Sequence, residues 1–136
     1  MTDAKKLDEL MNLAVEARER SYAPYSKYRV GAALLTKDGT VYQGCNIENA
    51  SFTPTICAER TAFFKAIYDG VRDFEAIAII GSGDLPAFPC GVCRQVMSEF
   101  CDGGFIISVA NRDRSEVVTE TLEQMMPHRF GPKDLL

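Results

Sequence analysis

Two short cysteine motifs impose the strongest constraint on the fold of this chain. The first is Cys57-Ala58-Glu59-Arg60, and the second is Pro89-Cys90-Gly91-Val92-Cys93. Three thiols can hold one zinc ion, which takes four tetrahedral ligands in a closed structural site but keeps one position open in a catalytic site. The motifs therefore indicate a hydrolytic enzyme in which residues 57 and 90–93 face the same ion.

Both motifs stand where the sequence predicts the beginning of a helix. Cys90 and Cys93 are three residues apart, so both thiols can face one ion. Cys57 and Glu59 are two residues apart and do not share a helix face, so they converge only if the ion lies off the helix N-terminus. Helix N-termini stabilise negative charge and therefore thiolates. Arg60 is the nearest candidate to offset the charge of three thiolates.

The apolar pattern predicts one α/β domain in the 136 residues. The turn signal Asp38-Gly39 predicts a hairpin, and alternating helices and strands follow it. The expected helices are 4–21, 57–68, 90–100 and 122–126, and the expected strands are 28–36, 41–45, 76–80, 105–110 and one near 117–118. This order predicts a three-layer α-β-α sandwich around a mixed five-stranded sheet.

The charge of the chain disfavours a polyanionic partner. Its formal net charge is −4, and the most basic stretch, residues 111–114, is interrupted by an acid. Nucleic-acid-binding proteins usually carry a basic patch or stripe, so we expect a small-molecule substrate and no nucleic acid. No signal-peptide core or membrane-spanning stretch is evident, so we expect a cytoplasmic protein without a membrane partner. Its five cysteines then favour metal binding over disulfides.

Four blocks, spread over nearly the whole chain, together form a specific signature. They are residues 23–33 (APYSKYRVGAA), 44–50 (GCNIENA), 57–62 (CAERTA) and 89–95 (PCGVCRQ). The last two contain Pro-Cys-x-x-Cys and a glutamate that is not a ligand, which is the signature of zinc deaminases. The blocks resemble the zinc-dependent cytidine deaminases of the homotetrameric class. The resemblance implies the fold of that family and hydrolytic deamination of cytidine and 2′-deoxycytidine to the uridines, with release of ammonia, in pyrimidine salvage.

The resemblance also implies a role for each residue of the metal site. Cys57, Cys90 and Cys93 would hold one Zn²⁺ per subunit, which activates a hydroxide for attack on C4 of the pyrimidine. Glu59 would take a proton from water, deliver one to N3 and later protonate the departing amine. Arg60 would donate hydrogen bonds to the thiolates.

On the same basis the substrate-binding residues are expected to be Tyr28, Asn46, Glu48, Ala50, Phe52, Ala58 and Phe130. Asn46 and Glu48 would clasp the ribose 3′-hydroxyl. Ala50, Phe52 and Phe130 would come from neighbouring subunits, so we expect an obligate homotetramer with shared sites.

Two aromatic positions depart from the family pattern. Many relatives carry Phe where this chain has Tyr28, and others carry Tyr where it has Phe52. Tyr28 would still place its ring beside the base or sugar, with a hydroxyl that seeks a partner if it is buried. The hydroxyl-mediated contact of relatives with Tyr at the second position would be lost.

Other functions remain open from the residues. Deaminases of an analogue such as blasticidin S also use three thiols. A structural zinc module with Cys45 or Cys101 as the fourth ligand would not explain Glu59. Cys90 and Cys93 alone are compatible with a redox dithiol. Deaminases of polynucleotides, tRNA or dCMP typically show His-x-Glu, and the one histidine, His128, is not followed by that pattern.

Overall fold

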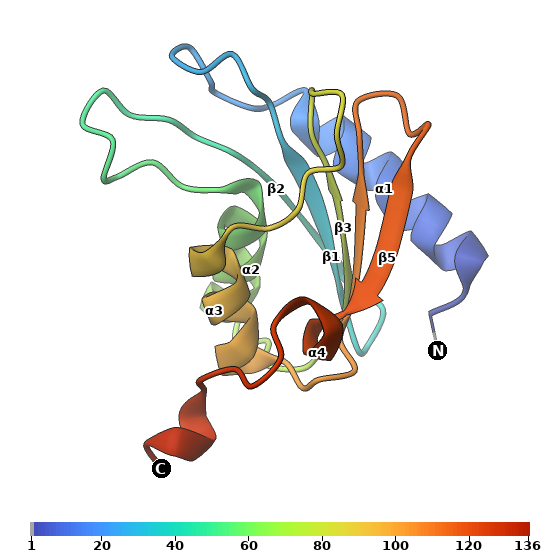
Figure 1. The fold of residues 1–136 in the computed structure, drawn as a ribbon, viewed down its shortest axis with the longest axis vertical. Helices are drawn as coiled ribbons and strands as arrows, with labels where there is room; N and C mark the ends of the chain where they lie inside the picture. The colour runs from blue at the N-terminus through green and yellow to red at the C-terminus, as the bar shows by residue number, and fades with distance from the viewer. Residues whose placement is uncertain (1) are drawn as a thin grey trace.

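A computed structural model describes residues 2–136, in which helices cover both faces of one five-stranded sheet (Figure 1). The elements are α1 (Ala4–Arg18), β1 (Gly31–Thr36), β2 (Val41–Cys45), α2 (Ala58–Tyr68), β3 (Phe74–Ile80), α3 (Gly91–Phe100), β4 (Ile106–Ala110), β5 (Val117–Thr121), α4 (Leu122–Met125) and a 3-10 helix (Pro132–Asp134). The predicted α-β-α sandwich and mixed sheet are confirmed.

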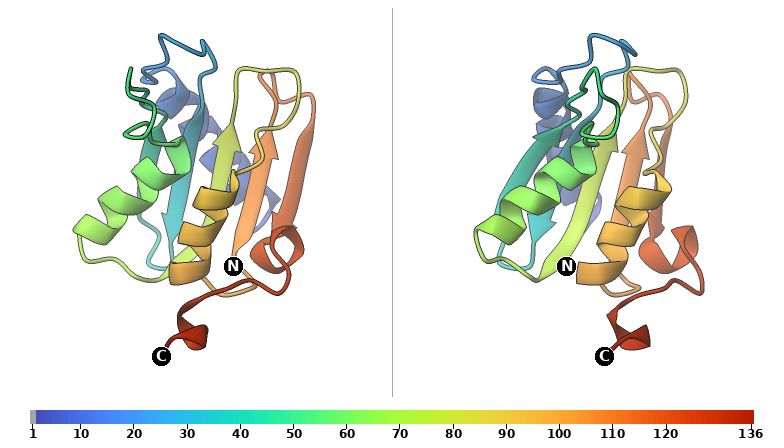
Figure 2. Two further views of the ribbon diagram at one scale, coloured as in Figure 1. Left: turned by 60° about the vertical axis from the view of Figure 1, so that its left-hand side comes forward. Right: turned by 90° about the vertical axis from the view of Figure 1, so that its left-hand side faces the viewer.

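The strand order is β2-β1-β3-β4-β5, with β3 and β4 parallel and the other neighbours antiparallel. A parallel pair needs a crossover connection, and α3 supplies it between β3 and β4. Helix α2 precedes β3 and lies beside α3 on the same face of the sheet, opposite α1 (Figure 2). The N-termini of α2 and α3 therefore lie at the same end of the sheet.

The two faces of the sheet carry separate hydrophobic cores, because successive side chains of a strand point to opposite faces. On β1, Ala32 and Leu34 pack towards α2 and α3, whereas Ala33 and Leu35 pack towards α1. Strand β3 alternates in the same way and is buried on both faces, as its apolar run predicts. The core under α2 and α3 includes Phe63, Met97, Phe105, Ile77, Ile79 and Ile107.

Two glycines let the helices approach the sheet closely. A Cβ atom at Gly31 would lie 2.0 Å from the carbonyl oxygen of Ala14 in α1. A Cβ atom at Gly44 would lie 2.3 Å from the carbonyl oxygen of Ala58, the first residue of α2. Gly44 thus allows β2 to pack against the beginning of the helix that follows Cys57.

Strand β3 begins at Phe74 instead of residue 76, and two other predicted boundaries, at the end of α1 and the beginning of β1, are each wrong by three residues. Helix α1 ends at Arg18 instead of residue 21, because the next three backbone N–H groups bond to carbonyls three residues earlier. Strand β1 begins at Gly31 instead of residue 28, because the N–H groups of Tyr28, Arg29 and Val30 donate to side chains. The 3-10 helix was not expected. No helix within residues 2–136 has the length and apolar character needed to span a bilayer.

Candidate active site

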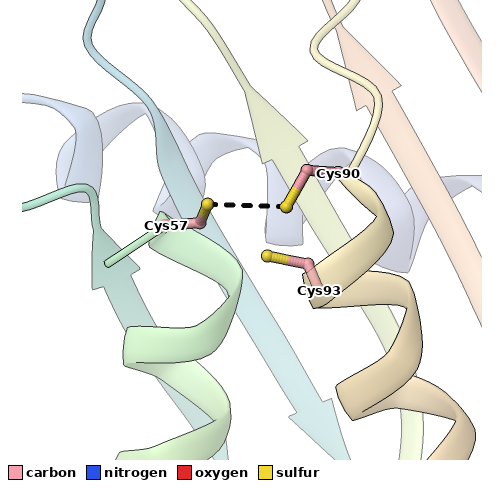
Figure 3. A group of neighbouring side chains, drawn as sticks. All are labelled: Cys57, Cys90 and Cys93. Carbon is pink, nitrogen blue, oxygen red and sulfur yellow. Dashed lines mark hydrogen bonds between the residues drawn. The ribbon is translucent and has the colours of Figure 1, made fainter. Parts of the chain in front are cut away.

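The three cysteines of the two motifs meet at the N-termini of α2 and α3. Cys57 is the N-cap of α2, Cys90 is the N-cap of α3, and Cys93 lies in the first turn of α3. Their Sγ atoms all lie within 4.8 Å of one another, and those of Cys57 and Cys90 are 3.7 Å apart. Figure 3 shows the three side chains pointing into the gap between the two helices. The thiols therefore converge off the helix ends, as the spacing predicts.

This thiol cluster fits zinc in both spacing and chemistry. Zn–S bonds of about 2.3 Å in tetrahedral geometry separate two sulfurs by about 3.8 Å, close to the 3.7 Å between Cys57 and Cys90. Neither N-cap thiol is used to cap its own helix. Among the described residues Cys45 and Cys101 lie outside the cluster, and His128 is exposed and also outside it. Among the described residues the cluster therefore offers three protein ligands, which would leave one position of a tetrahedral ion open.

The electrostatics of the cluster favour a thiolate at Cys57. Hydrogen bonding from Cys93 is the largest effect, and together with Arg60 and Cys90 it outweighs burial and lowers the pKa of Cys57 to about 5. The corresponding interaction with Cys57, together with burial, raises the pKa of Cys93. Nη2 of Arg60 donates to Sγ of Cys57 at 3.2 Å. The guanidinium is therefore placed where it stabilises negative charge on sulfur.

Glu59 is a buried carboxyl group in the first turn of α2, with 5% of its surface exposed. Burial is the main cause that raises its pKa to about 7, and the charge of Cys57 adds to the effect. A carboxyl group with a pKa near neutrality can both accept and release a proton at physiological pH. Glu59 thus has the properties of a proton carrier beside the thiols.

A cleft of about 300 Å³ opens next to the thiols and collects most of the expected site residues. It is lined by Ser26, Tyr28, Val30, Asn46, Glu48, Thr55, Ile56, Cys57, Ala58, Glu59, Ala87, Phe88 and Cys90. The walls come from the α1–β1 connection, the β2–α2 loop, the beginning of α2 and the loop before α3. The structure therefore brings the metal motifs and the expected sugar-binding pair to one cleft.

Tyr28 lies against the β3–α3 loop and is 39% exposed. A Cβ atom at Gly81 would lie 2.2 Å from the Tyr28 hydroxyl, and one at Gly83 would lie 3.1 Å from the ring. Burial, together with the charge of Glu59, raises the pKa of Tyr28. The hydroxyl that distinguishes Tyr28 from phenylalanine is accommodated by glycine at position 81.

Three expected substrate contacts lie outside this cleft in the chain itself. Phe52 is 77% exposed and lines a neighbouring cleft, and Ala50 is exposed. Phe130 is 55% exposed, and its backbone carbonyl accepts a hydrogen bond from Gln95 of α3. A single copy of the chain does not bring these residues to the thiols.

Several lining residues were not predicted from the sequence. Ser26 and Val30 lie in the same block as Tyr28, and Phe88 stands two residues before Cys90, so proximity in sequence was a usable signal. Thr55 and Ile56 directly precede Cys57, so the same signal applied to them, whereas Ala87 reaches the cleft through the fold of its loop.

Comparison with known proteins agrees with this geometry. Residues 4–109 match the sequence profile described as the cytidine and deoxycytidylate deaminase zinc-binding region. The chain is 47% identical over 129 residues to a cytidine deaminase of Sporosarcina psychrophila, covering 95% of this chain and 94% of the relative. A crystal structure of cytidine deaminase from Burkholderia pseudomallei superimposes with a TM-score of 0.86 at 44% identity, over 90% of this chain and 98% of the other. A blasticidin-S deaminase of Bacillus cereus is 29% identical over 130 residues, covering 90% of each chain.

Proposed function

Because this chain belongs to the cytidine and deoxycytidylate deaminase family, we propose that its cleft hydrolyses cytidine and 2′-deoxycytidine to the uridines and ammonia. One observation carries the proposal. Three thiols lie within 4.8 Å of one another, and two of them, Cys57 and Cys90, line one cleft together with Glu59, a buried carboxyl group with a pKa of about 7. Hydrolytic deamination needs water activation and proton transfer at the same place, and this arrangement provides both.

Cys57, Cys90 and Cys93 would hold one Zn²⁺ in each subunit. When bound, the ion supplies a Lewis acid that lowers the pKa of water towards neutrality. Glu59 takes a proton from water and delivers it to N3 of the pyrimidine, and then takes the proton of the hydroxyl group added at C4 and delivers it to the departing amine. General acid–base help of this kind contributes roughly 10²–10⁴-fold to the rate. Arg60 holds the Cys57 thiolate through its hydrogen bond.

The same cleft would orient the nucleoside. Asn46 and Glu48 bind the ribose 3′-hydroxyl, because an amide and a carboxylate can together donate to and accept from one hydroxyl group. Tyr28, which lines the same cleft, presents its ring to the base or sugar. Ala58, a small residue at the beginning of α2, leaves room for the base beside Glu59.

We propose further that the active form is a homotetramer whose subunits share their sites. The exposure of Ala50, Phe52 and Phe130 supports this, since none of them lines the cleft of its own chain. Helix α2 also exposes Phe64 and Tyr68, at 45% and 91%. Sedimentation of the active species tests the assembly, and full activity in an isolated monomer would overturn it.

The substrate assignment is tested by incubating the zinc-loaded protein with cytidine, 2′-deoxycytidine and blasticidin S in separate reactions. Chromatography of the products, together with an ammonia assay, shows which of the three substrates is deaminated. Efficient conversion of the two cytidines with slow or no conversion of blasticidin S supports the proposal. Preference for blasticidin S would overturn it, and would identify the cleft as that of an analogue deaminase.

A further inference from the structure

The carboxylate of Glu48 is held by the turn between α1 and β1. Its Oε1 accepts from the backbone N–H groups of Tyr25 and Ser26, at 3.0 and 3.1 Å, and its Oε2 accepts from the Ser26 hydroxyl. The hydrogen bond from the Ser26 hydroxyl is the main reason that the pKa of Glu48 is lowered. Glu48 is therefore ionised at neutral pH and accepts hydrogen bonds only.

The side-chain amide of Asn46 is also held by hydrogen bonds at both its oxygen and its nitrogen. Its Oδ1 accepts from the Val30 backbone N–H at 2.9 Å and from the Ser21 hydroxyl, and its Nδ2 donates to the Tyr28 carbonyl at 2.8 Å. The Val30 N–H can only donate and the Tyr28 carbonyl can only accept, so these two backbone groups determine which end of the amide is oxygen. The Ser21 hydroxyl facing Oδ1 must then donate its proton.

Asn46 and Glu48 have few hydrogen-bonding sites left for a substrate. A carboxylate or amide oxygen accepts two hydrogen bonds in its plane, and an amide nitrogen donates two. Both sites on Oε1 of Glu48 and both on Oδ1 of Asn46 are filled. One accepting site remains on Oε2 of Glu48 and one N–H remains on Asn46. A group that both accepts and donates a single hydrogen bond, such as one hydroxyl, satisfies the pair.

We propose that Ser26 and Ser21 are positioning residues that set the hydrogen-bond polarity of the sugar-binding pair. Each serine fills an accepting site that would otherwise be open to the substrate or to water. Ser26 restricts Glu48 to one free acceptor, and Ser21 restricts Asn46 to donation. The α1–β1 connection, which lies outside the metal motifs, thereby selects for the sugar hydroxyl. The inference rests on the proposed function, because it assigns that hydroxyl as the group bound.

Ser26 also accepts a hydrogen bond from the Tyr28 backbone N–H at 3.0 Å. Removal of the Ser26 hydroxyl can therefore disturb the Tyr28 ring as well as Glu48. A shift of Tyr28 would change the turnover of every nucleoside, whereas altered polarity of Glu48 changes only the contribution of the sugar hydroxyl. Comparison of two substrates that differ in that hydroxyl separates the two effects.

The experiment measures kcat and KM of the zinc-loaded enzyme with cytidine and with 3′-deoxycytidine. For Ser26→Ala we expect kcat/KM for cytidine to fall about 10-fold, mainly through KM, because a hydrogen bond to a charged group is lost. For Ser21→Ala we expect about a 3-fold fall, since Val30 still holds Oδ1. The values for 3′-deoxycytidine should stay within about 2-fold of wild type in both variants.

Two further variants complete the test. Ser26→Thr keeps the hydroxyl and should restore discrimination between the two substrates. Ser115→Ala removes a serine hydroxyl that lies outside the cleft and accepts a hydrogen bond from the Asn111 amide at 2.9 Å. This control should change kcat/KM for neither substrate. If Ser26→Ala does not fold, Ser21→Ala decides by the same ratio.

The outcomes separate this inference from the proposed function. A smaller ratio of kcat/KM for cytidine to kcat/KM for 3′-deoxycytidine in the alanine variants than in the wild type supports the positioning role. If kcat/KM falls equally for both substrates, or falls for neither, in the alanine variants, the positioning role is overturned. The proposed function still stands in that case, provided that the wild type converts cytidine. A zinc-loaded wild type that converts neither substrate overturns the proposed function itself.

Discussion

Nη2 of Arg60 donates a hydrogen bond to Sγ of Cys57 at 3.2 Å, while Nε of the same guanidinium is buried without a protein partner. Arg60 follows Cys57 by one helical turn, so its charge is held beside the thiol cluster by the beginning of α2. Three thiolates around a divalent ion carry a net negative charge, and a fixed cation lowers the free energy of that state. The contact links metal retention to a residue that is not itself a ligand.

Replacement of Arg60 by Gln should weaken zinc binding by about 10-fold or more, since groups that hold metal ligands typically contribute 10–100-fold to affinity. Competition with a chromophoric chelator measures the affinity. Arg72→Gln is the matched control, because Arg72 donates to the backbone carbonyls of Ile67, in the last turn of α2, and of Val71, in the loop after it. Equal zinc affinity in the Arg60 variant and wild type would contradict this role.

Replacement of Glu59 by Gln should lower kcat at least about 100-fold, because the amide cannot carry the proton. Zinc content should stay at wild-type level, since all three thiols remain. Turnover of cytidine and metal analysis on the same preparation provide both values. Near-normal turnover in a zinc-loaded Glu59→Gln enzyme would remove Glu59 from the proposed mechanism.

The metal motifs were predictable because their geometry is local to two helix N-termini. Cys57, Cys90 and Cys93 needed only the prediction that both segments begin helices. The beginning of β1 was less predictable, because the backbone N–H groups of Arg29 and Val30 donate to the side chains of Ser82 and Asn46, which are distant in sequence.

Residues of the cleft that depend on loop folding were also missed. Ala87 carries no periodic signal and enters the cleft through the tertiary arrangement of its loop. The positions of Phe52 and Phe130 relative to a substrate cannot follow from one copy of the chain, because both side chains are exposed on it. Their roles stay predictions that depend on assembly.

Replacement of Gly44 by Ala should destabilise the protein by about 3 kcal/mol or more, at the upper end of the cost of overpacking. The added Cβ would lie 2.3 Å from the Ala58 carbonyl oxygen and 2.6 Å from the Ala62 nitrogen, both backbone atoms of α2. Denaturant unfolding measures the free energy. Gly104→Ala is the control, because its Cβ would meet only Oδ1 of Asp102 at 3.5 Å. Equal stability of the two variants would show that β2 does not constrain α2.

Asp38 provides a pH-dependent contribution to stability at the β1–β2 turn. Hydrogen bonds to the Asp38 carboxylate lower its pKa below the usual 3.8. The bond from the Thr36 hydroxyl has the largest effect, followed by the bond from the Thr40 backbone N–H. A lowered folded-state pKa gives stability that is fully present above the unfolded-state pKa and is lost as the pH falls through the folded-state pKa. The stability difference between wild type and Asp38→Asn should therefore be largest near neutral pH and shrink below pH 3.8. Denaturant unfolding across this range measures it, and a constant difference would contradict the assignment.

The most direct test of the account is to remove the metal from the purified protein, measure cytidine conversion, and restore zinc. Uridine and ammonia should form in equal amounts in the native protein, cease to form after chelation, and return when zinc is added. Cys93→Ser, which removes one ligand from the cluster, should not regain activity under the same conditions. Undiminished conversion by protein shown to be free of metal, or none by fully zinc-loaded protein, would contradict the central claim.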